Sequence, residues 1–159
     1  MNKQITDKQF VELIQENKGL ILKICIFYTK TNADLQDLFQ DIVLNAWKGY
    51  QSFRSDSKFS TWLYSVALHT ALFLQRKKRV VSEPLTENIP DQGLPYREIE
   101  QSDEMYAAIN SLNDIEKSIV LLYLDGYSYD EMEKITGISN ATLRVKMNRI
   151  KLKLKNIVK

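Results

Sequence analysis

Apolar residues return every three or four positions along most of the chain, the spacing that places them on one side of an α-helix. Residues 32–50 give the clearest case, with the apolar positions Leu35, Leu38, Ile42, Ala46 and Tyr50. Similar stretches predict one continuous helix from Thr6 to Tyr28 and another over residues 59–80. With only 5 Gly and 3 Pro among 159 residues, turns are too few for a β protein, so we expect an all-α fold.

The last third of the chain predicts four shorter helices. Two of them cover residues 104–112 and 114–126, and the second begins with Asn113 as a cap and Glu116 three residues later. This spacing is typical of a capping box, in which each of the two side chains bonds the backbone of the other residue.

The next two helices lie on either side of Gly137. Ser128 and Glu131 have the capping-box spacing at the start of the first, and Ser139 can cap the second immediately after the glycine. Two helices joined by so tight a turn predict a helix-turn-helix.

Charge and composition divide the chain into two domains. Residues 1–79 carry a net charge of +5, residues 80–104 one of −6, and residues 105–159 one of +3. The acidic middle segment holds all three prolines and lacks apolar periodicity, which is typical of a linker. We therefore expect domains at residues 1–80 and 103–159, joined by a flexible linker over 81–102.

The final helix has one apolar and one cationic side. Its apolar stripe is Leu143, Met147, Ile150, Leu154 and Ile157, and the opposite side and its flanks hold six Lys and Arg residues. A membrane-surface helix would need a free apolar face, but here the domain's own core requires that stripe. A solvated basic helix is the common alternative, but it does not explain the helix-turn-helix. We interpret the final helix as a reader of the DNA major groove.

Neither catalysis nor a cofactor is predicted. The sequence has no glycine-rich phosphate loop, no Cys and His spacing for a metal, and no nucleophile with a suitable base. Its single cysteine, Cys25, excludes an internal disulfide and favours a reducing compartment. Because no catalytic constellation is present, we expect that the protein is not an enzyme. No signal segment or membrane span is visible in the sequence, so we also expect a cytoplasmic protein.

Two segments resemble the bacterial RNA polymerase sigma factors of the extracytoplasmic-function (ECF) class. In the first half, DLQDLFQDIVLNAW followed by FRSDSKFSTWLYSVA is similar to that family's polymerase-binding and promoter-melting regions. In the second, SLNDIEKSIVLLYLDGYSYDEMEKITGISNATLRVKMNRIK is similar to its reader of the upstream promoter element. The resemblance extends from about Phe10 to about Lys155.

The resemblance implies three contact surfaces. The polymerase-binding residues would be Asp37, Gln40 and Asp41. The minus-ten element would contact Phe53, Arg54, Ser55, Asp56, Ser57, Lys58, Trp62, His69, Arg76, Lys77, Lys78 and Arg79. The minus-thirty-five element would contact Ser139, Thr142, Arg144, Val145, Lys146, Asn148 and Arg149. Whether Trp62 and Tyr64 stack on bases or belong to the core stays open, because the helix that carries them also needs anchoring.

The same resemblance implies the partners. They would be core RNA polymerase, promoter DNA as duplex and as the single non-template strand, and an anti-sigma factor, with the free protein a monomer outside the membrane. Two alternatives remain: a stand-alone helix-turn-helix regulator that binds DNA without polymerase, and a helical interaction or membrane-surface protein.

Overall fold

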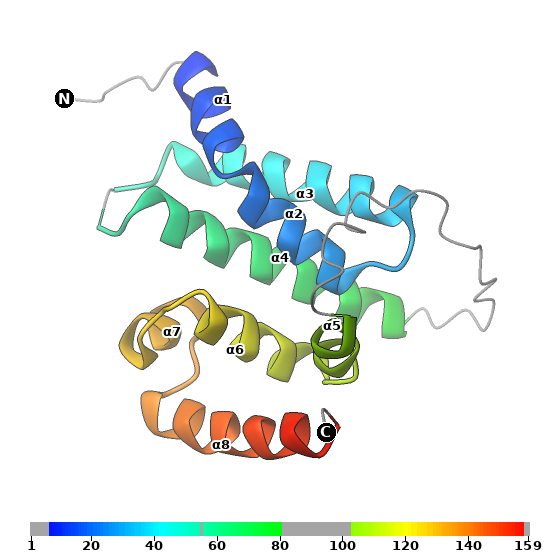
Figure 1. Ribbon diagram of the computed structural model, residues 1–159. Helices are drawn as coiled ribbons and strands as arrows, with labels where there is room; N and C mark the ends of the chain where they lie inside the picture. Colours follow the sequence, from blue (N-terminus) through cyan, green and yellow to red (C-terminus); the bar gives the residue numbers. More distant parts are fainter. Residues whose placement is uncertain (1–6, 55, 81–102, 158–159) are drawn as a thin grey trace. The chain divides into compact units, whose positions relative to one another are not determined.

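The computed structural model describes residues 7–54, 56–80 and 103–157. These residues form eight α-helices (Figure 1), and they fall into two compact units, one before and one after residues 81–102. The predicted all-α fold is confirmed. The predicted cap Thr6, the predicted DNA contact Ser55 and the predicted linker over residues 81–102 lie outside the described residues.

The first unit contains α1 (Asp7–Glu16), α2 (Lys18–Tyr28), α3 (Asn32–Tyr50) and α4 (Phe59–Val80). Helices α2, α3 and α4 each pack against the other two, and α1 contacts α2 (Figure 1). The Phe10 ring of α1 also packs against Trp47 of α3. The five apolar residues predicted to form the inner stripe of α3 are all buried. Burial of the three large aliphatic side chains among them, Leu35, Leu38 and Ile42, stabilises the unit by about 1.5–3 kcal/mol each.

One continuous helix from Thr6 to Tyr28 was the wrong prediction, because the helix is interrupted at Asn17. This residue has φ −108° and ψ 14°, and its side-chain amide donates a hydrogen bond to the Leu13 carbonyl at 2.8 Å. An Asn side chain can compete in this way with the helical backbone. Gly19, a poor helix former, stands two positions later. The first unit therefore has four helices among its described residues, where the sequence predicted three.

The second unit contains α5 (Asp103–Asn110), α6 (Asp114–Leu124), α7 (Tyr129–Thr136) and α8 (Asn140–Ile157), the four helices predicted. Helix α8 packs against each of the other three, so the small core is built around it (Figure 1). Its buried residues come from all four helices and include Ala108, Ile119, Leu122, Met132, Ile135 and Leu143.

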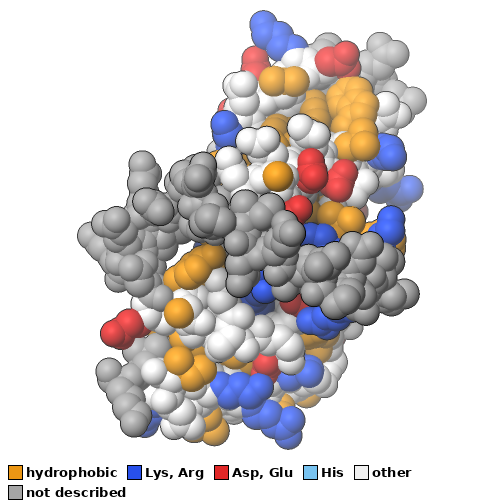
Figure 2. Space-filling view, turned by 90° about the vertical axis from the view of Figure 1, so that its right-hand side faces the viewer, with side chains coloured by type: hydrophobic (Ala, Val, Ile, Leu, Met, Phe, Trp, Pro, Cys, Tyr) orange, Lys and Arg blue, Asp and Glu red, His pale blue; other side chains and the backbone are white. Residues whose placement is uncertain are grey.

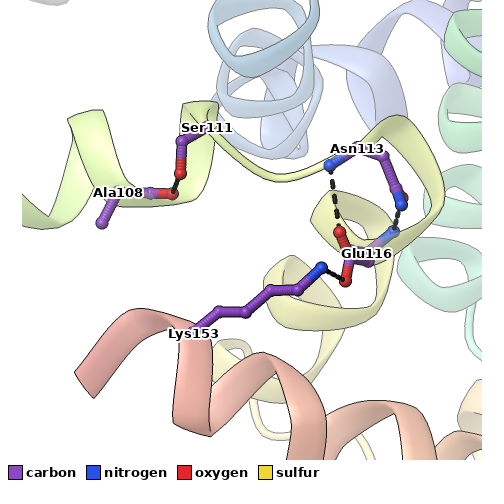
Figure 3. A network of polar contacts seen from close by, with 5 residues as sticks. All are labelled: Ala108, Ser111, Asn113, Glu116 and Lys153. Carbon is purple, nitrogen blue, oxygen red and sulfur yellow. Dashed lines mark hydrogen bonds and ion pairs between the residues drawn. The ribbon is translucent and has the colours of Figure 1, made fainter. Parts of the chain in front are cut away.

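Local capping interactions set the boundaries of α6. The Asn113 side chain accepts the Glu116 N–H at 2.8 Å, and Glu116 accepts the Asn113 N–H at 3.2 Å, as the sequence predicted (Figure 3). At the other end, the Tyr127 N–H reaches back to the Leu122 carbonyl at 3.2 Å. This pattern is a Schellman motif, and it ends the helix before α7 begins.

Candidate nucleic-acid interface

The turn between α7 and α8 has the geometry of a helix-turn-helix. Gly137 lies in the left-handed region at φ +77° and donates its N–H to the Glu133 carbonyl at 2.8 Å. Ser139 then caps α8 by accepting the Thr142 N–H at 3.3 Å, and its hydroxyl also bonds the Thr142 hydroxyl. Both predicted caps, Ser128 and Ser139, are confirmed. Ser128 sets the start of α7, and Ser139 sets the start of α8 immediately after the turn.

The buried side of α8 follows the predicted stripe for most of its length. Leu143, Met147 and Ile150 are buried, and Leu154 is half-buried. The prediction is wrong for Ile157, which is 51% exposed. Ile157 is the last residue of the helix, and the packing against the other helices already weakens one turn earlier, at Leu154.

The opposite side of α8 is open to solvent. Arg144, Val145, Asn148 and Arg149 are exposed, whereas Lys146 is half-buried. Lys and Arg side chains gather along the lower edge of the space-filling view, where α8 lies (Figure 2). Cationic and amide side chains on the exposed face of a second helix are the groups that bond base edges and phosphates in the major groove.

Two tyrosines hold basic side chains on one flank of α8. Arg144 lies over the Tyr129 ring at 4.8 Å, and Lys151 lies over the Tyr123 ring at the same distance. The two rings are 6.5 Å apart, one at the end of α6 and one at the start of α7. No local spacing in the sequence indicates these partners, because they are distant from α8 along the chain.

The start of α4 and the preceding loop are held by an aromatic cluster, defined as Tyr50, Phe53, Phe59 and Trp62. The centres of the Phe53 and Phe59 rings lie 5.2 and 5.6 Å from that of the Trp62 ring. The centres of the Tyr50 and Phe59 rings are 5.6 Å apart. A Cβ at Gly49 would stand 3.1 Å from the Trp62 ring, so a larger residue there would require the indole to shift by a few tenths of an ångström. Trp62 is half-buried in this cluster, and its packing helps hold the loop.

The remaining residues predicted at the minus-ten element differ in exposure. Phe53 is half-buried, and Arg54, Asp56, Ser57 and Lys58 are exposed around it. Tyr64, whose role the sequence left open, is 1% exposed and belongs to the core.

Helix α4 carries a second exposed surface farther along its length. His69 and all four bases from Arg76 to Arg79 are exposed, and Lys78 lies 3.7 Å from Asp34 at the start of α3. Phe73, absent from the predicted contacts, is 62% exposed. Because it is four positions after His69 and three before Arg76, it shares their helix face. An exposed ring beside cationic side chains suits base stacking and phosphate attraction.

The predicted polymerase-binding strip lies on α3. Asp37 and Gln40 are exposed and Asp41 is half-buried. Next to the strip is an apolar groove of about 490 Å³ between α1 and α3, to which Gln40 contributes. Its other lining residues are Asp7, Phe10, Val11, Phe39, Val43, Leu44 and Trp47. The sequence signal for this groove is the set of apolar residues on α3 outside its buried stripe, which could have indicated a second apolar surface on the helix.

Other chemistry is limited in the part of the chain that the structure describes. Burial raises the pKa of the Cys25 thiol to about 12, so the thiol stays protonated and unreactive near neutral pH. Residues 7–54, 56–80 and 103–157 hold no group of three or more His, Cys, Asp or Glu side chains placed to bind a metal ion. Among those residues, no helix combines the length and hydropathy that a membrane span needs.

Two units of helices, one of which ends in a helix-turn-helix with a cationic outer face, define an all-α, helix-turn-helix class of protein. Comparisons with known proteins give the family. Residues 13–80 match the model of Sigma-70 region 2, and residues 102–154 match that of Sigma-70, region 4. The chain belongs to the sigma-70 family and to its ECF class, whose members are transcription initiation factors and not enzymes.

Curated relatives and solved structures agree with this assignment. The ECF RNA polymerase sigma-E factor of Escherichia coli K12 is 28% identical, with 99% of this chain and 97% of the relative covered. That of Haemophilus influenzae is 26% identical over 98% and 97%. The fold is similar to the Bartonella quintana sigma factor RpoE, solved with the anti-sigma factor NepR, at TM-score 0.71, 21% identity and coverage of 92% and 96%. It is also similar to CnrH, solved with the cytosolic domain of CnrY, at TM-score 0.70, 19% identity and coverage of 97% and 90%.

Proposed function

We propose that this protein binds core RNA polymerase in the cytoplasm and directs it to promoters by contacting a minus-ten and a minus-thirty-five element. The observation that carries the proposal is the exposed cationic face of α8, which stands on a helix-turn-helix within the region matched to Sigma-70, region 4. The domains in this proposal are residues 1–80 and 103–159, with residues 81–102 as the connection.

The polymerase contact is assigned to the α3 strip of Asp37, Gln40 and Asp41. These polar side chains lie outside the buried stripe of α3, in the segment matched to Sigma-70 region 2. The core of the first unit uses the other side of the helix, so the strip is free to bind a partner. Substitution of the strip should therefore affect binding more than folding.

The minus-ten contact is assigned to the loop around Phe53 and to α4. An unpaired base requires a flat stacking surface and nearby positive charge, and Phe53, Phe73 and the bases of α4 supply both. Extruding a base costs a few kcal/mol, which a preformed aromatic cluster and cationic side chains help to offset. This contact would open the DNA downstream of the duplex contact.

The minus-thirty-five contact is assigned to α8, which would lie in the major groove. Arg144, Asn148 and Arg149 are exposed and have side chains able to bond base edges. Two modest DNA contacts joined by one chain gain affinity through effective concentration. The spacing between the two promoter elements would then contribute to specificity.

Control by an anti-sigma factor is part of the proposal. Two proteins of similar fold were solved with partners, one of them named an anti-sigma factor, and a regulator that covers the α3 strip or α8 would block initiation. We propose that the chain is a monomer when neither polymerase nor such a regulator is bound.

The test is reconstitution with bacterial core RNA polymerase on a fragmented genomic template, with sequencing of transcript starts. Starts that cluster downstream of one shared two-part motif are the expected result. If a folded protein bound a duplex operator tightly without polymerase and selected no starts, the stand-alone regulator would replace this function.

A matched pair of triple variants tests the α3 strip. Alanine at Asp37, Gln40 and Asp41 should abolish polymerase binding and leave duplex DNA binding by the second unit unchanged. Alanine at Glu12, Gln15 and Glu16 is the control, because it removes the same two acids and one amide from exposed positions of α1. Equal polymerase affinity for the two triple variants would refute the assignment of the strip.

A further inference from the structure

A chain of two hydrogen bonds leads from α7 to the side chain of Arg144. The Asp130 carboxylate accepts a bond from the Asn140 side-chain amide at 2.7 Å. The amide oxygen of Asn140 in turn accepts the Nε–H of Arg144, also at 2.7 Å. Asp130 lies in the first turn of α7 and Asn140 is the first residue of α8, so the relay crosses the helix-turn-helix.

The chemistry of the three groups gives this relay a direction. A carboxylate only accepts and a guanidinium only donates, so the Asn140 amide satisfies both when its nitrogen faces Asp130 and its oxygen faces Arg144. Asp130 thereby selects the amide orientation that presents an acceptor to Arg144. Without it, the amide would be free to turn and present its nitrogen, which would repel the guanidinium.

The Tyr129 ring supports the same guanidinium from a second direction. The Arg144 Cζ lies 4.8 Å from the centre of that ring, close enough for a cation–π contact. With Nε bonded to Asn140 and one face against the ring, the two terminal nitrogens are left for a ligand. A pair of N–H groups in one plane matches the two acceptors of a guanine, O6 and N7.

We propose that Asp130 is a positioning residue for base selection: through Asn140 it orients Arg144 for an end-on, two-bond contact with a guanine of the upstream promoter element. This inference rests on the proposed function. It adds a specificity determinant on α7, a helix for which the sequence predicted no DNA contact. Asp130 itself touches no DNA in this arrangement.

The experiment uses the full chain with core RNA polymerase and promoter DNA that the wild-type complex selects from genomic fragments. Each base pair of the upstream element is replaced in turn, and affinity is measured for wild type, Arg144→Ala, Asp130→Ala and Asp130→Asn. Wild type should prefer guanine at one position by roughly 5- to 150-fold, and Arg144→Ala should abolish that preference. Asp130→Ala should reduce it by roughly 2- to 10-fold, the effect of one orienting hydrogen bond.

The two Asp130 variants separate orientation from charge. Both remove the same negative charge, but an asparagine oxygen can still accept the bond from Asn140. Asp130→Asn should therefore keep the guanine preference that Asp130→Ala loses. Glu133→Ala, which removes an exposed acid from the same helix, is the control and should keep the preference as well. In an Arg144→Ala background, Asp130→Ala should change nothing further at this position.

Three results would overturn the inference: a full guanine preference in Asp130→Ala, an equal loss in Asp130→Asn, or an equal loss in Glu133→Ala. A direct readout is the Arg144 Nε–H resonance in the free protein, whose slow exchange with water should be lost in Asp130→Ala and kept in Asp130→Asn. Exchange that is as fast in wild type as in Asp130→Ala would also overturn it. Failure of wild type to select any promoter would instead refute the proposed function.

Discussion

The contact between Glu116 and Lys153 ties the end of α8 to the start of α6. The Lys153 ammonium lies 2.6 Å from one carboxylate oxygen of Glu116, and the other oxygen accepts the Asn113 N–H at 3.2 Å (Figure 3). The Glu116 side chain is only 13% exposed, whereas that of Lys153 is 53% exposed. Replacing Glu116 by Gln keeps the capping geometry and removes the charge, so it isolates the ion pair.

The size of the effect lies between two known cases. A fully exposed ion pair contributes about 0.2–1 kcal/mol, and a hydrogen bond to a charged group about 1.5–3 kcal/mol. Because one partner is sheltered and the other is largely in solvent, we expect Glu116→Gln to lower the free energy of unfolding of the second unit by about 1 kcal/mol at pH 7. For a domain this small, that corresponds to a melting temperature lower by about 4–8 °C.

The effect should depend on pH in a defined direction. Burial raises the pKa of Glu116, but the bonds from Lys153 and the Asn113 N–H, with the charges of Lys153 and Lys146, outweigh burial and lower the pKa below 4.5. A lowered folded-state pKa means that the stabilisation is present above about pH 4.5 and disappears as the pH falls through the folded-state value. Wild type and Glu116→Gln should therefore differ at pH 7 and converge in strong acid.

The free energy of unfolding of the second unit can be measured by amide hydrogen exchange of α8 in the full chain, because these amides report on the second unit alone. A double-mutant cycle with Lys153→Gln should give a coupling energy near the single-variant effect, and Lys155→Gln, at an exposed position of the same helix, is the control. A difference below about 0.3 kcal/mol at pH 7, under the range for exposed pairs, would refute the ion-pair argument. So would a difference that persists unchanged at pH 2.

Three further variants test the turn, the core and base selection. Gly137→Ala should destabilise the second unit by about 1–2 kcal/mol, because φ is +77° and alanine is strained in the left-handed region even where there is space for its Cβ. Denaturant titration measures this loss, and an unchanged midpoint would contradict the prediction. Leu143→Ala should lower the free energy of unfolding of the second unit by about 2–5 kcal/mol. Helical circular dichroism should fall while tryptophan fluorescence stays unchanged, since both tryptophans are in the first unit. Leu152→Ala, at a 63% exposed position, is the matched control, and an equal loss of stability in it would refute the packing role of Leu143. Arg149→Lys should lower discrimination at one upstream base pair by about 1–3 kcal/mol and keep the salt dependence of binding, whereas unchanged promoter selection would exclude base contact by Arg149.

Helix positions and caps followed from the sequence because the interactions that set them are local. The inner stripe of α3 repeats every three or four residues, and the capping boxes of α6 and α7 join groups three residues apart. The exposed position of Val145 and Asn148 also followed from helical periodicity, once the opposite side of α8 was assigned to the core. For the same reason, the all-α class and the helix-turn-helix were predictable from one sequence.

Tertiary structure alone decided the features that depend on contacts between distant segments. The burial of Tyr64, the packing of Trp62 near Tyr50 and the groove between α1 and α3 arise where separate helices meet. The exposure of Ile157 reflects where the neighbouring helices stop, which periodicity does not record. The interruption at Asn17 is a local competition between side chain and backbone whose outcome propensity alone did not predict.

The position of Arg144 follows from the sequence, whereas its contacts depend on the tertiary structure. Its place on the exposed side of α8 follows from the sequence, because it depends only on the helical repeat. Its hydrogen bond to Asn140, the link to Asp130 and the contact with Tyr129 depend on how α7 crosses α8 after the turn. That crossing is set by the packing of the whole unit, so the sequence determined which side chains face outward and the tertiary structure decided how this one is held.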